Sequence, residues 1–201
     1  MRTKFDITWY NTHTPGIEKL KMDTSNGIMV ESLSVGNSSE QDSWSLEYYL
    51  SSDANLDLQE WKIKCFHLNT NRNPIAVTHQ LYLERKNNQW TGHLDSETVG
   101  PFASTKYIDI SSTPFTNYFP IRELIQNGKD EATFKVLFVE VPKLSISLKD
   151  QIYKKVGHGK FSYQSKGSPN VYTIEVDDNG ITISYDNLWQ RIINPISMNF
   201  R

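Results

Sequence analysis

Cysteine is nearly absent from this sequence of 201 residues, in which Cys65 is the only one. A lone thiol cannot form an intramolecular disulfide, and it cannot build a metal site that needs several cysteines. Residues 61–66 alternate between apolar and polar side chains, which is typical of a strand. We therefore interpret Cys65 as a half-buried structural thiol, with a catalytic nucleophile as the alternative.

Long apolar segments are also missing. No window approaches the roughly 18 consecutive apolar residues that a transmembrane helix needs. Residues 1–9 contain two basic side chains but no apolar stretch after them, so the pattern of a secretory signal is absent. These features predict a cytoplasmic protein without a transmembrane segment.

Neither sign of charge dominates the chain. The sequence has 21 Lys and Arg residues and 23 Asp and Glu residues, which gives a formal net charge of −2. A nucleic-acid-binding protein would show a basic stripe, and a protein attracted to anionic membranes would show a polybasic cluster. The sequence shows neither pattern, so we expect no nucleic-acid partner.

Motifs for cofactor chemistry are missing as well. There is no glycine loop for phosphates or dinucleotides, no His-Glu-x-x-His and no nucleophile elbow. The five histidines are scattered and lack metal-ligand spacing, although His67 and His79 could approach across neighbouring strands. We therefore predict no metal and no other cofactor, and we assign no catalytic residue.

Aromatic residues are abundant, at 12% of the chain, and much of the sequence alternates with a period of two. Both properties favour strands. The clearest hairpin joins residues 172–177 to residues 181–185, because Asn179-Gly180 supplies the positive φ angles of a tight turn. Further strands are expected at residues 43–50, 61–66, 77–85, 89–93 and 132–141.

Helix signals are weak by comparison. A short helix is expected within residues 117–127, where Pro120 suits the first turn and Gly128 suits the end. A final turn is expected at residues 188–193. About a dozen strands without βαβ alternation predict an all-β fold of residues 1–201 as a single domain, either a sandwich, a barrel or a rolled sheet.

Residues 107–124 depart from the strand pattern. Pro114 and Pro120 make this segment stiff, and it carries hydrogen-bonding side chains beside several aromatic rings, a combination that suits a hydroxyl-rich ligand. Arg122 could also bind a carboxylate or phosphate as a fork. The alternative is a plug that satisfies its own backbone and in which Arg122 pairs with an internal acid such as Asp109.

At this segment the chain resembles a known family. Thr-Pro-Phe-Thr-Asn-Tyr-Phe-Pro-Ile-Arg-Glu-Leu at residues 113–124 is similar to the family's Thr-Pro-x-Thr-Asn-x-x-Pro-Ile-Arg-x-Leu. Further matching runs follow in the family's order at residues 141–144, 151–153, 161–165, 176–180 and 188–191. The family is the one named "Putative glycolipid-binding", formerly a domain of unknown function, and the resemblance covers residues 9–192. Tyr107 stands where the family has a second Asp, and residues 194–201 form a tail beyond the resemblance.

The resemblance implies a single, highly curved antiparallel sheet, rolled into a half-barrel or spiral β-roll with at most one or two short helices. It also implies that the concave face of the sheet binds a glycolipid or another amphipathic small molecule without catalysis. Aromatic rings would contact the apolar part of the ligand, and polar side chains would contact its head. The candidate ligand-binding residues are Trp9, Glu18, Asp53, Trp61, Asp109, Thr113, Asn117, Arg122, Gln151, Tyr153, Tyr185 and Arg191.

Two other functions stay open. An enzyme acting on a small or glycosylated substrate could use Glu18, Asp53 or Asp109 as an acid or base, if two carboxylates met in one pocket with a shifted pKa. A protein-interaction module, such as a homodimer, would instead expose an apolar patch. The alternative for Arg191 is that it caps the sheet by pairing with a carboxylate such as Glu18 or Asp53, because a buried guanidinium needs a carboxylate partner.

Overall fold

The computed structural model describes residues 4–39, 42–53, 57–69, 74–103 and 105–193, so the expected tail at 194–201 lies outside the described residues. Within these ranges the chain forms one sheet of 15 strands, one α-helix and one short 3-10 helix. In chain order the elements are β1 (Lys4–Asn11), β2 (Gly16–Asp23), β3 (Met29–Ser39), β4 (Asp42–Ser52), β5 (Leu58–Asn69), β6 (Ile75–Lys86), β7 (Gln89–Leu94), β8 (Glu97–Ala103), β9 (Tyr107–Ile110), η1 (Phe115–Asn117), α1 (Tyr118–Gln126), β10 (Glu131–Glu140), β11 (Ser145–Gly157), β12 (Lys160–Ser165), β13 (Tyr172–Val176), β14 (Thr182–Tyr185) and β15 (Trp189–Ile193).

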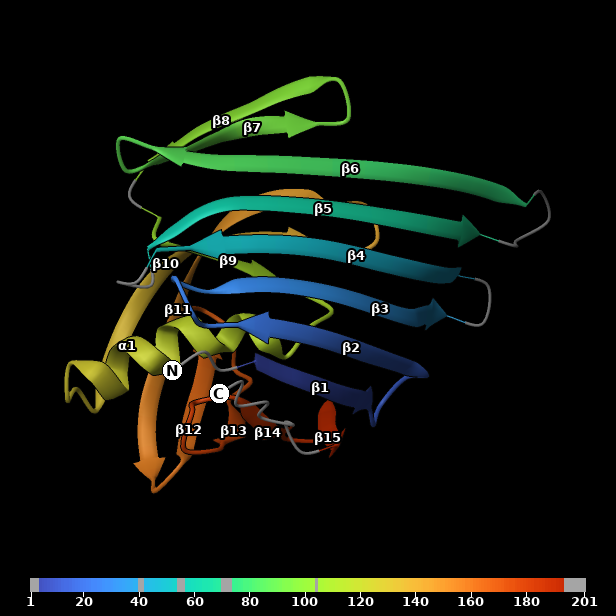
Figure 1. Ribbon diagram of the computed structural model, residues 1–201. Helices are drawn as coiled ribbons and strands as arrows, with labels where there is room; N and C mark the ends of the chain where they lie inside the picture. The colour runs from blue at the N-terminus through green and yellow to red at the C-terminus, as the bar shows by residue number, and fades with distance from the viewer. Residues whose placement is uncertain (1–3, 40–41, 54–56, 70–73, 104, 194–201) are drawn as a thin grey trace.

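The strands follow the order β8-β7-β6-β5-β4-β3-β2-β1-β15-β14-β13-β12-β11-β10-β9 across the sheet. Two meanders therefore meet where β1 pairs with β15 (Figure 1). Neighbouring strands are antiparallel except for β9 and β10, which are parallel because η1 and α1 connect them as a crossover. The expected all-β fold with one rolled sheet is confirmed, although the described residues form more strands than the expected dozen.

The expectation of a final turn at residues 188–193 is wrong, because most of this segment is the strand β15. It pairs with β1 on one side, where Arg191 lies opposite Trp9, and with β14 on the other. A local sequence pattern does not report a partner strand at the other end of the chain. Tertiary pairing therefore decides the conformation of this segment.

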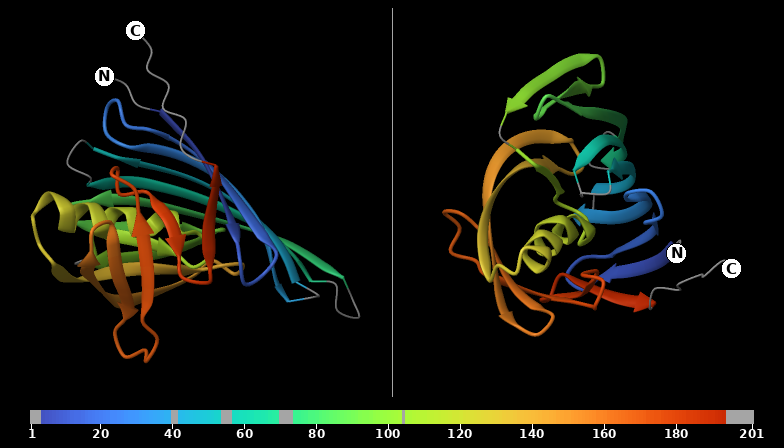
Figure 2. Two further views of the ribbon diagram at one scale, coloured as in Figure 1. Left: turned by 90° about the horizontal axis from the view of Figure 1, so that it is seen from below. Right: turned by 60° about the vertical axis from the view of Figure 1, so that its left-hand side comes forward.

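The sheet curls around α1, which lies inside the roll between the N-terminal and C-terminal meanders (Figure 2). The edge strands β8 and β9 do not pair with each other, so the sheet is not closed into a barrel. The helix expected within residues 117–127 is confirmed. It buries Phe119, Ile121 and Leu124 in the core and ends at Gln126, two residues before Gly128, whose φ of 59° suits the position after a helix terminus.

Strand alternation separates an inner face from an outer one. On β2, Glu18, Leu20 and Met22 are buried, whereas Lys19 and Lys21 between them are exposed. The same period on the neighbouring strands directs apolar side chains into the core around α1. The inner face is therefore packed, and the outer face carries charged and polar side chains.

Candidate functional site

The chain between β9 and β10 fills the roll as a plug, defined here as residues 111–126. The plug meets a buried acid, Glu18 of β2. One carboxyl oxygen, Glu18 Oε1, accepts hydrogen bonds from Thr113 of the plug at 2.9 Å, Ser32 of β3 at 2.7 Å and Tyr48 of β4 at 2.7 Å. Within the described residues the other oxygen, Oε2, has no partner. Burial raises the pKa of Glu18 to about 7, although the three hydrogen bonds oppose this rise.

A second acid, the half-buried Asp109 of β9, connects the plug to the opposite side of the roll. Its two oxygens accept hydrogen bonds from Thr116 of the plug and from Gln151 of β11, each at 2.6 Å. Beside them, Tyr153 donates to Asn117 of the plug at 2.8 Å. Burial raises the pKa of Asp109, and the bonds from Thr116 and Gln151 lower it. The structure thus brings together four of the sequence candidates, Asp109, Asn117, Gln151 and Tyr153.

A cluster of tyrosine rings continues from Gln151 across β11–β14. Tyr163 accepts a hydrogen bond from Gln151 at 3.1 Å, and its ring lies 5.2 Å from that of Tyr153 and 6.1 Å from that of Tyr185. Tyr163 and Tyr172 were not among the sequence candidates. They could have been found only from the register between strands, because Tyr153, Tyr163 and Tyr172 lie opposite one another on successive strands.

Arg191 forms a buried ion pair with Asp177. The distance between Arg191 Nη1 and Asp177 Oδ2 is 2.8 Å, and only 5% of the arginine side chain is exposed. Arg191 thus has a carboxylate partner, but Glu18 and Asp53 were the wrong candidates for it, because the turn between β13 and β14 brings Asp177 to β15. Asp177 also accepts the backbone amides of Asn179 and Ile181 at 3.0 Å, so it holds the turn as well.

Arg122 packs from α1 against the same turn. A Cβ atom added to Gly180 would lie 2.6 Å from Arg122 Cδ. The expected pairing of Arg122 with Asp109 is not formed, since Asp109 binds Thr116 and Gln151 instead. The helix therefore uses Arg122 to contact the β13–β14 turn.

The remaining sequence candidates occupy two different places. Trp9 and Trp61 are fully buried. The Trp9 indole donates to the Thr182 carbonyl at 2.9 Å, and the Trp61 ring stacks on Tyr48 at 5.8 Å. Asp53 lies apart from them, after β4, where its carboxylate accepts the amide of Asp57 at 2.9 Å.

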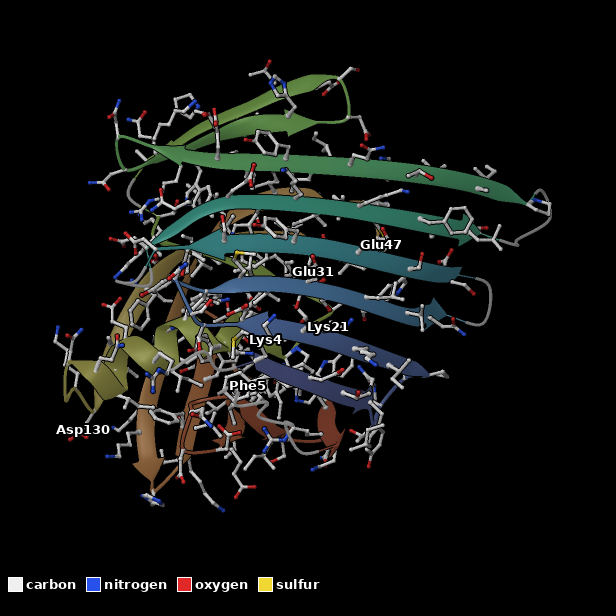
Figure 3. All side chains as sticks on the ribbon, viewed as in Figure 1. Lys4, Phe5, Lys21, Glu31, Glu47 and Asp130 are labelled. Carbon is white, nitrogen blue, oxygen red and sulfur yellow. The ribbon has the colours of Figure 1, made fainter. Side chains whose placement is uncertain are left out.

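A groove of about 710 Å³ lies on the outer face of the sheet, across β2–β7. Its volume is within the range of small-molecule sites. All of the sequence candidates belong to the described residues, and none of them lines this groove. Figure 3 shows three of its residues, Lys21, Glu31 and Glu47, on successive strands of the face turned away from α1.

Strand register arranges the groove side chains in two rows. Row one runs from β2 to β7 through Lys21, Glu31, Tyr49, Lys62, Tyr82 and His93. Row two lies two residues further along each strand and runs through Lys19, Leu33, Glu47, Lys64, Gln80 and Asp95. Because side chains two residues apart share one face of a strand, both rows point away from the core.

Lys62 lies at the centre of row one. Its ammonium group is 5.7 Å from the ring centroid of Tyr49 and 5.9 Å from that of Tyr82. It also pairs with Glu60 at 3.2 Å. Contacts with two rings and a carboxylate restrict the flexible lysine chain, so a charged donor is held above the floor of the groove.

The histidines and the cysteine contribute no metal centre to the described part of the chain. His67 and His79 contact separate carboxylates, Asp42 at 3.1 Å and Asp95 at 2.9 Å. No group of three or more metal-ligating side chains occurs within the described ranges. Cys65 is fully buried, and burial raises its pKa to about 11, which agrees with a structural thiol.

One open, rolled and mostly antiparallel sheet defines the class of protein, and solved structures share this overall fold. A DUF1089 family protein from Pseudomonas aeruginosa aligns with a TM-score of 0.70 at 26% identity, covering 87% of this chain and 92% of that one. A β-barrel-like protein of the DUF1849 domain from Brucella abortus aligns with a TM-score of 0.54 at 8% identity, covering 98% and 97%, and this likeness concerns the fold alone.

The family model described as "Putative glycolipid-binding" matches residues 6–191, and the chain belongs to this family. The family expected from the sequence motifs is thereby confirmed. No curated protein matches the chain. Among the described residues, no helix has the length and apolar character needed to cross a membrane.

Proposed function

We propose that the protein binds a glycolipid, or a similar amphiphile with a hydroxyl-rich head, and that the head occupies the groove across β2–β7. The observation that carries this proposal is the composition of the two rows. They combine tyrosine rings with hydrogen-bond donors and acceptors in similar number, in a groove large enough for a small ligand. The binding is non-catalytic in this proposal.

The balance of charges favours a sugar over a phosphate. The groove contains four lysines, Lys19, Lys21, Lys62 and Lys64, and three carboxylates, Glu31, Glu47 and Asp95. A phosphate needs donors, and neighbouring carboxylates repel it. A sugar hydroxyl both donates and accepts hydrogen bonds, so it can use lysines and carboxylates together.

The tyrosines suit the same kind of head. The C–H face of a sugar ring is apolar and carries a slight positive charge, so it is complementary to the negative face of an aromatic ring. Tyr49 and Tyr82 bring two such rings into row one, on either side of Lys62. Stacking and hydrogen bonding can therefore act on one head group at the same time.

The inner, concave face, which the family resemblance favours as the binding surface, is less suited to the ligand than the groove. The plug and the core occupy it, and the acids there are engaged with the plug, Glu18 with Thr113 and Asp109 with Thr116. We propose that the interior candidate residues hold the plug in the roll. Neither interior acid lines the groove, which favours binding over acid–base catalysis by these groups.

The test is titration calorimetry with dodecyl maltoside below its micelle concentration, with dodecylphosphocholine as the comparison. Lys62→Ala should weaken maltoside binding about ten- to a hundredfold, because a charge-assisted hydrogen bond contributes about 1.5–3 kcal/mol. Native mass spectrometry of freshly purified protein, followed by lipid extraction, would then identify the natural ligand.

Lys154→Ala is the matched control. The side chains of Lys154 and Lys62 are both 58% exposed, and Lys154 pairs with Glu131 at 3.3 Å much as Lys62 pairs with Glu60 at 3.2 Å. Lys154 lies on β11, away from the groove. Equal affinities in the two variants, or tighter binding of the phosphocholine, would reject the proposal.

A further inference from the structure

A third row of side chains lies beside the groove on the same outer face, and it is apolar. Two residues beyond row two, the register places Tyr10, Ile17, Val35, Ser45 and Phe66 opposite one another on β1–β5. Their exposed fractions are 39% for Tyr10, 43% for Ile17, 41% for Val35 and 42% for Phe66. Leu33 of row two, which is 50% exposed, connects this row to the groove.

A second hollow continues from this apolar row. It has a volume of about 400 Å³ and lies at the ends of β2–β4, where Ile17, Val35 and Trp44 contribute to its wall. The Trp44 ring lies directly against Gly36, where a Cβ atom would approach Trp44 Cζ2 to 2.6 Å. The indole fills the space that Gly36 leaves on the inner face, because Trp44 alternates with Ser45 of row three and shares its face with buried Leu46.

The groove and the hollow are neighbours along the strands. Lys19 and Leu33 line the groove, and two residues further Ile17 and Val35 line the hollow. A strand advances about 3.4 Å per residue, so rows one and three, which are four residues apart, are separated by roughly 14 Å. A polar, ring-bearing surface thus passes into an apolar one over the length of a small amphiphile.

We propose that the apolar row and the hollow bind the tail of the ligand, which is a fatty acyl or alkyl chain attached to the sugar head. This inference rests on the proposed function and adds the orientation of the ligand. The head contacts row one near Lys62, and the tail crosses row three from Phe66 towards the hollow beside Val35. The orientation of the ligand follows from the polarity of the rows, since charged side chains dominate rows one and two and apolar side chains dominate row three.

A tryptophan introduced into row three allows a direct test of where the tail lies. Trp9, Trp61, Trp90 and Trp189 are at most 4% exposed, and the partly buried Trp44 lies on the inner face. In Phe66→Trp the new indole lies in row three, so a maltoside whose alkyl tail carries bromine should quench its emission, because bromine quenches an indole that it contacts. The natural protein should show little quenching, and the unbrominated maltoside should cause none.

Affinity measurements separate the inference from the function on which it rests. Dodecyl maltoside should bind at least tenfold more tightly than methyl maltoside, because its tail buries apolar surface. Val35→Ser should lower the affinity for dodecyl maltoside roughly three- to tenfold and leave that for methyl maltoside unchanged. Val156→Ser is the matched control, since Val156 is 55% exposed on β11, away from both the groove and the hollow.

Each outcome decides between the alternatives. Equal affinity for the two maltosides, or no added quenching in Phe66→Trp, would overturn the tail site and leave head-group binding intact. Absence of binding for both maltosides would reject the proposed function and the tail site together. If Val35→Ser abolished self-association in sedimentation experiments without changing the maltoside affinity, row three would be a contact between copies of the chain, and the inference would be wrong.

Discussion

Glu18 places a carboxyl group where solvent does not reach it. Three hydroxyl groups donate to its Oε1, while its Oε2 has no partner among the described residues. A fully buried charge with one unsatisfied oxygen is costly, so the protonated form is favoured. The result is an acid whose pKa burial raises from 4.5 to about 7.

The raised pKa predicts a specific dependence of stability on pH. Folded Glu18 keeps its proton up to about pH 7, whereas the unfolded chain releases it near pH 4.5. The stability that Glu18 contributes is therefore present below pH 4.5 and lost as the pH rises through 7, by on the order of 3 kcal/mol. Glu18→Gln lacks this titration, so its melting temperature relative to wild type should rise between pH 5 and pH 8.

Thermal denaturation of both proteins across this range measures the effect. Taking the difference between the two proteins removes the contribution of the other carboxylates, which both chains share. A difference that stays constant from pH 5 to pH 8 would show that Glu18 is ionised in the folded protein.

At the scale of elements, the hairpin β13–β14 and the helix α1 are joined through a glycine. Gly180 has a φ of 81°, and the Arg122 side chain occupies the space where its Cβ would lie. Gly180→Ala should therefore destabilise the protein twice, through backbone strain and through displacement of Arg122. We expect a total of roughly 2–4 kcal/mol.

Gly167→Ala separates the two effects. Gly167 has a φ of 88° but no atom within 4 Å of the position of its Cβ, so the substitution adds strain without a clash. Chemical denaturation should show a smaller loss for Gly167→Ala than for Gly180→Ala. Combining Gly180→Ala with Arg122→Ala should recover part of the difference, and two glycine variants of equal stability would contradict this account.

The elements that the sequence predicted well are those with local causes. Alternation identified β4, β5 and β6, and Asn179-Gly180 identified the hairpin that follows β13. Pro120 and Gly128 marked the ends of α1. β15 escaped prediction because its strand conformation depends on pairing with β1, which short-range patterns do not contain.

The candidate site was harder to predict because it depends on register between strands. Alternation alone shows that Lys19 and Lys21 point away from Leu20, but this pattern is the same for any solvated strand face. Only the pairing of β4, β5 and β6 places Lys62 between Tyr49 and Tyr82. The polar residues of the plug were recognisable as a group, yet their partners come from distant strands.

For the whole molecule, the open roll explains why the inner and outer faces differ in role. The plug enters between the two meanders and supplies the apolar surface that the inner face needs, as Figure 2 shows for α1. The outer face of β2–β7 is covered by no other element of the described chain. It is therefore available for the two rows that form the groove.

The strand order has a consequence for the connectivity of the chain. If the C-terminal strand β15 is followed by the N-terminal strand β1, every strand pairs with the next one in order, from β9 through β15 and β1 to β8. β1 and β15 are neighbours, with Thr8 opposite Ile193. A circular permutant that starts at β9 and joins β15 to β1 through a flexible linker would cross the sheet from one edge to the other in sequence order.

Such a permutant should keep the fold and reach it faster, because the pairing of β1 with β15 would become local, and local contacts speed folding. Circular dichroism would report the fold, and stopped-flow refolding would report the rate. Refolding slower than that of the natural order would mean that closing the distant pair does not limit the rate. The strand order is therefore cyclic, and the two ends of the natural chain lie at β1 and β15, which are paired in the centre of the sheet.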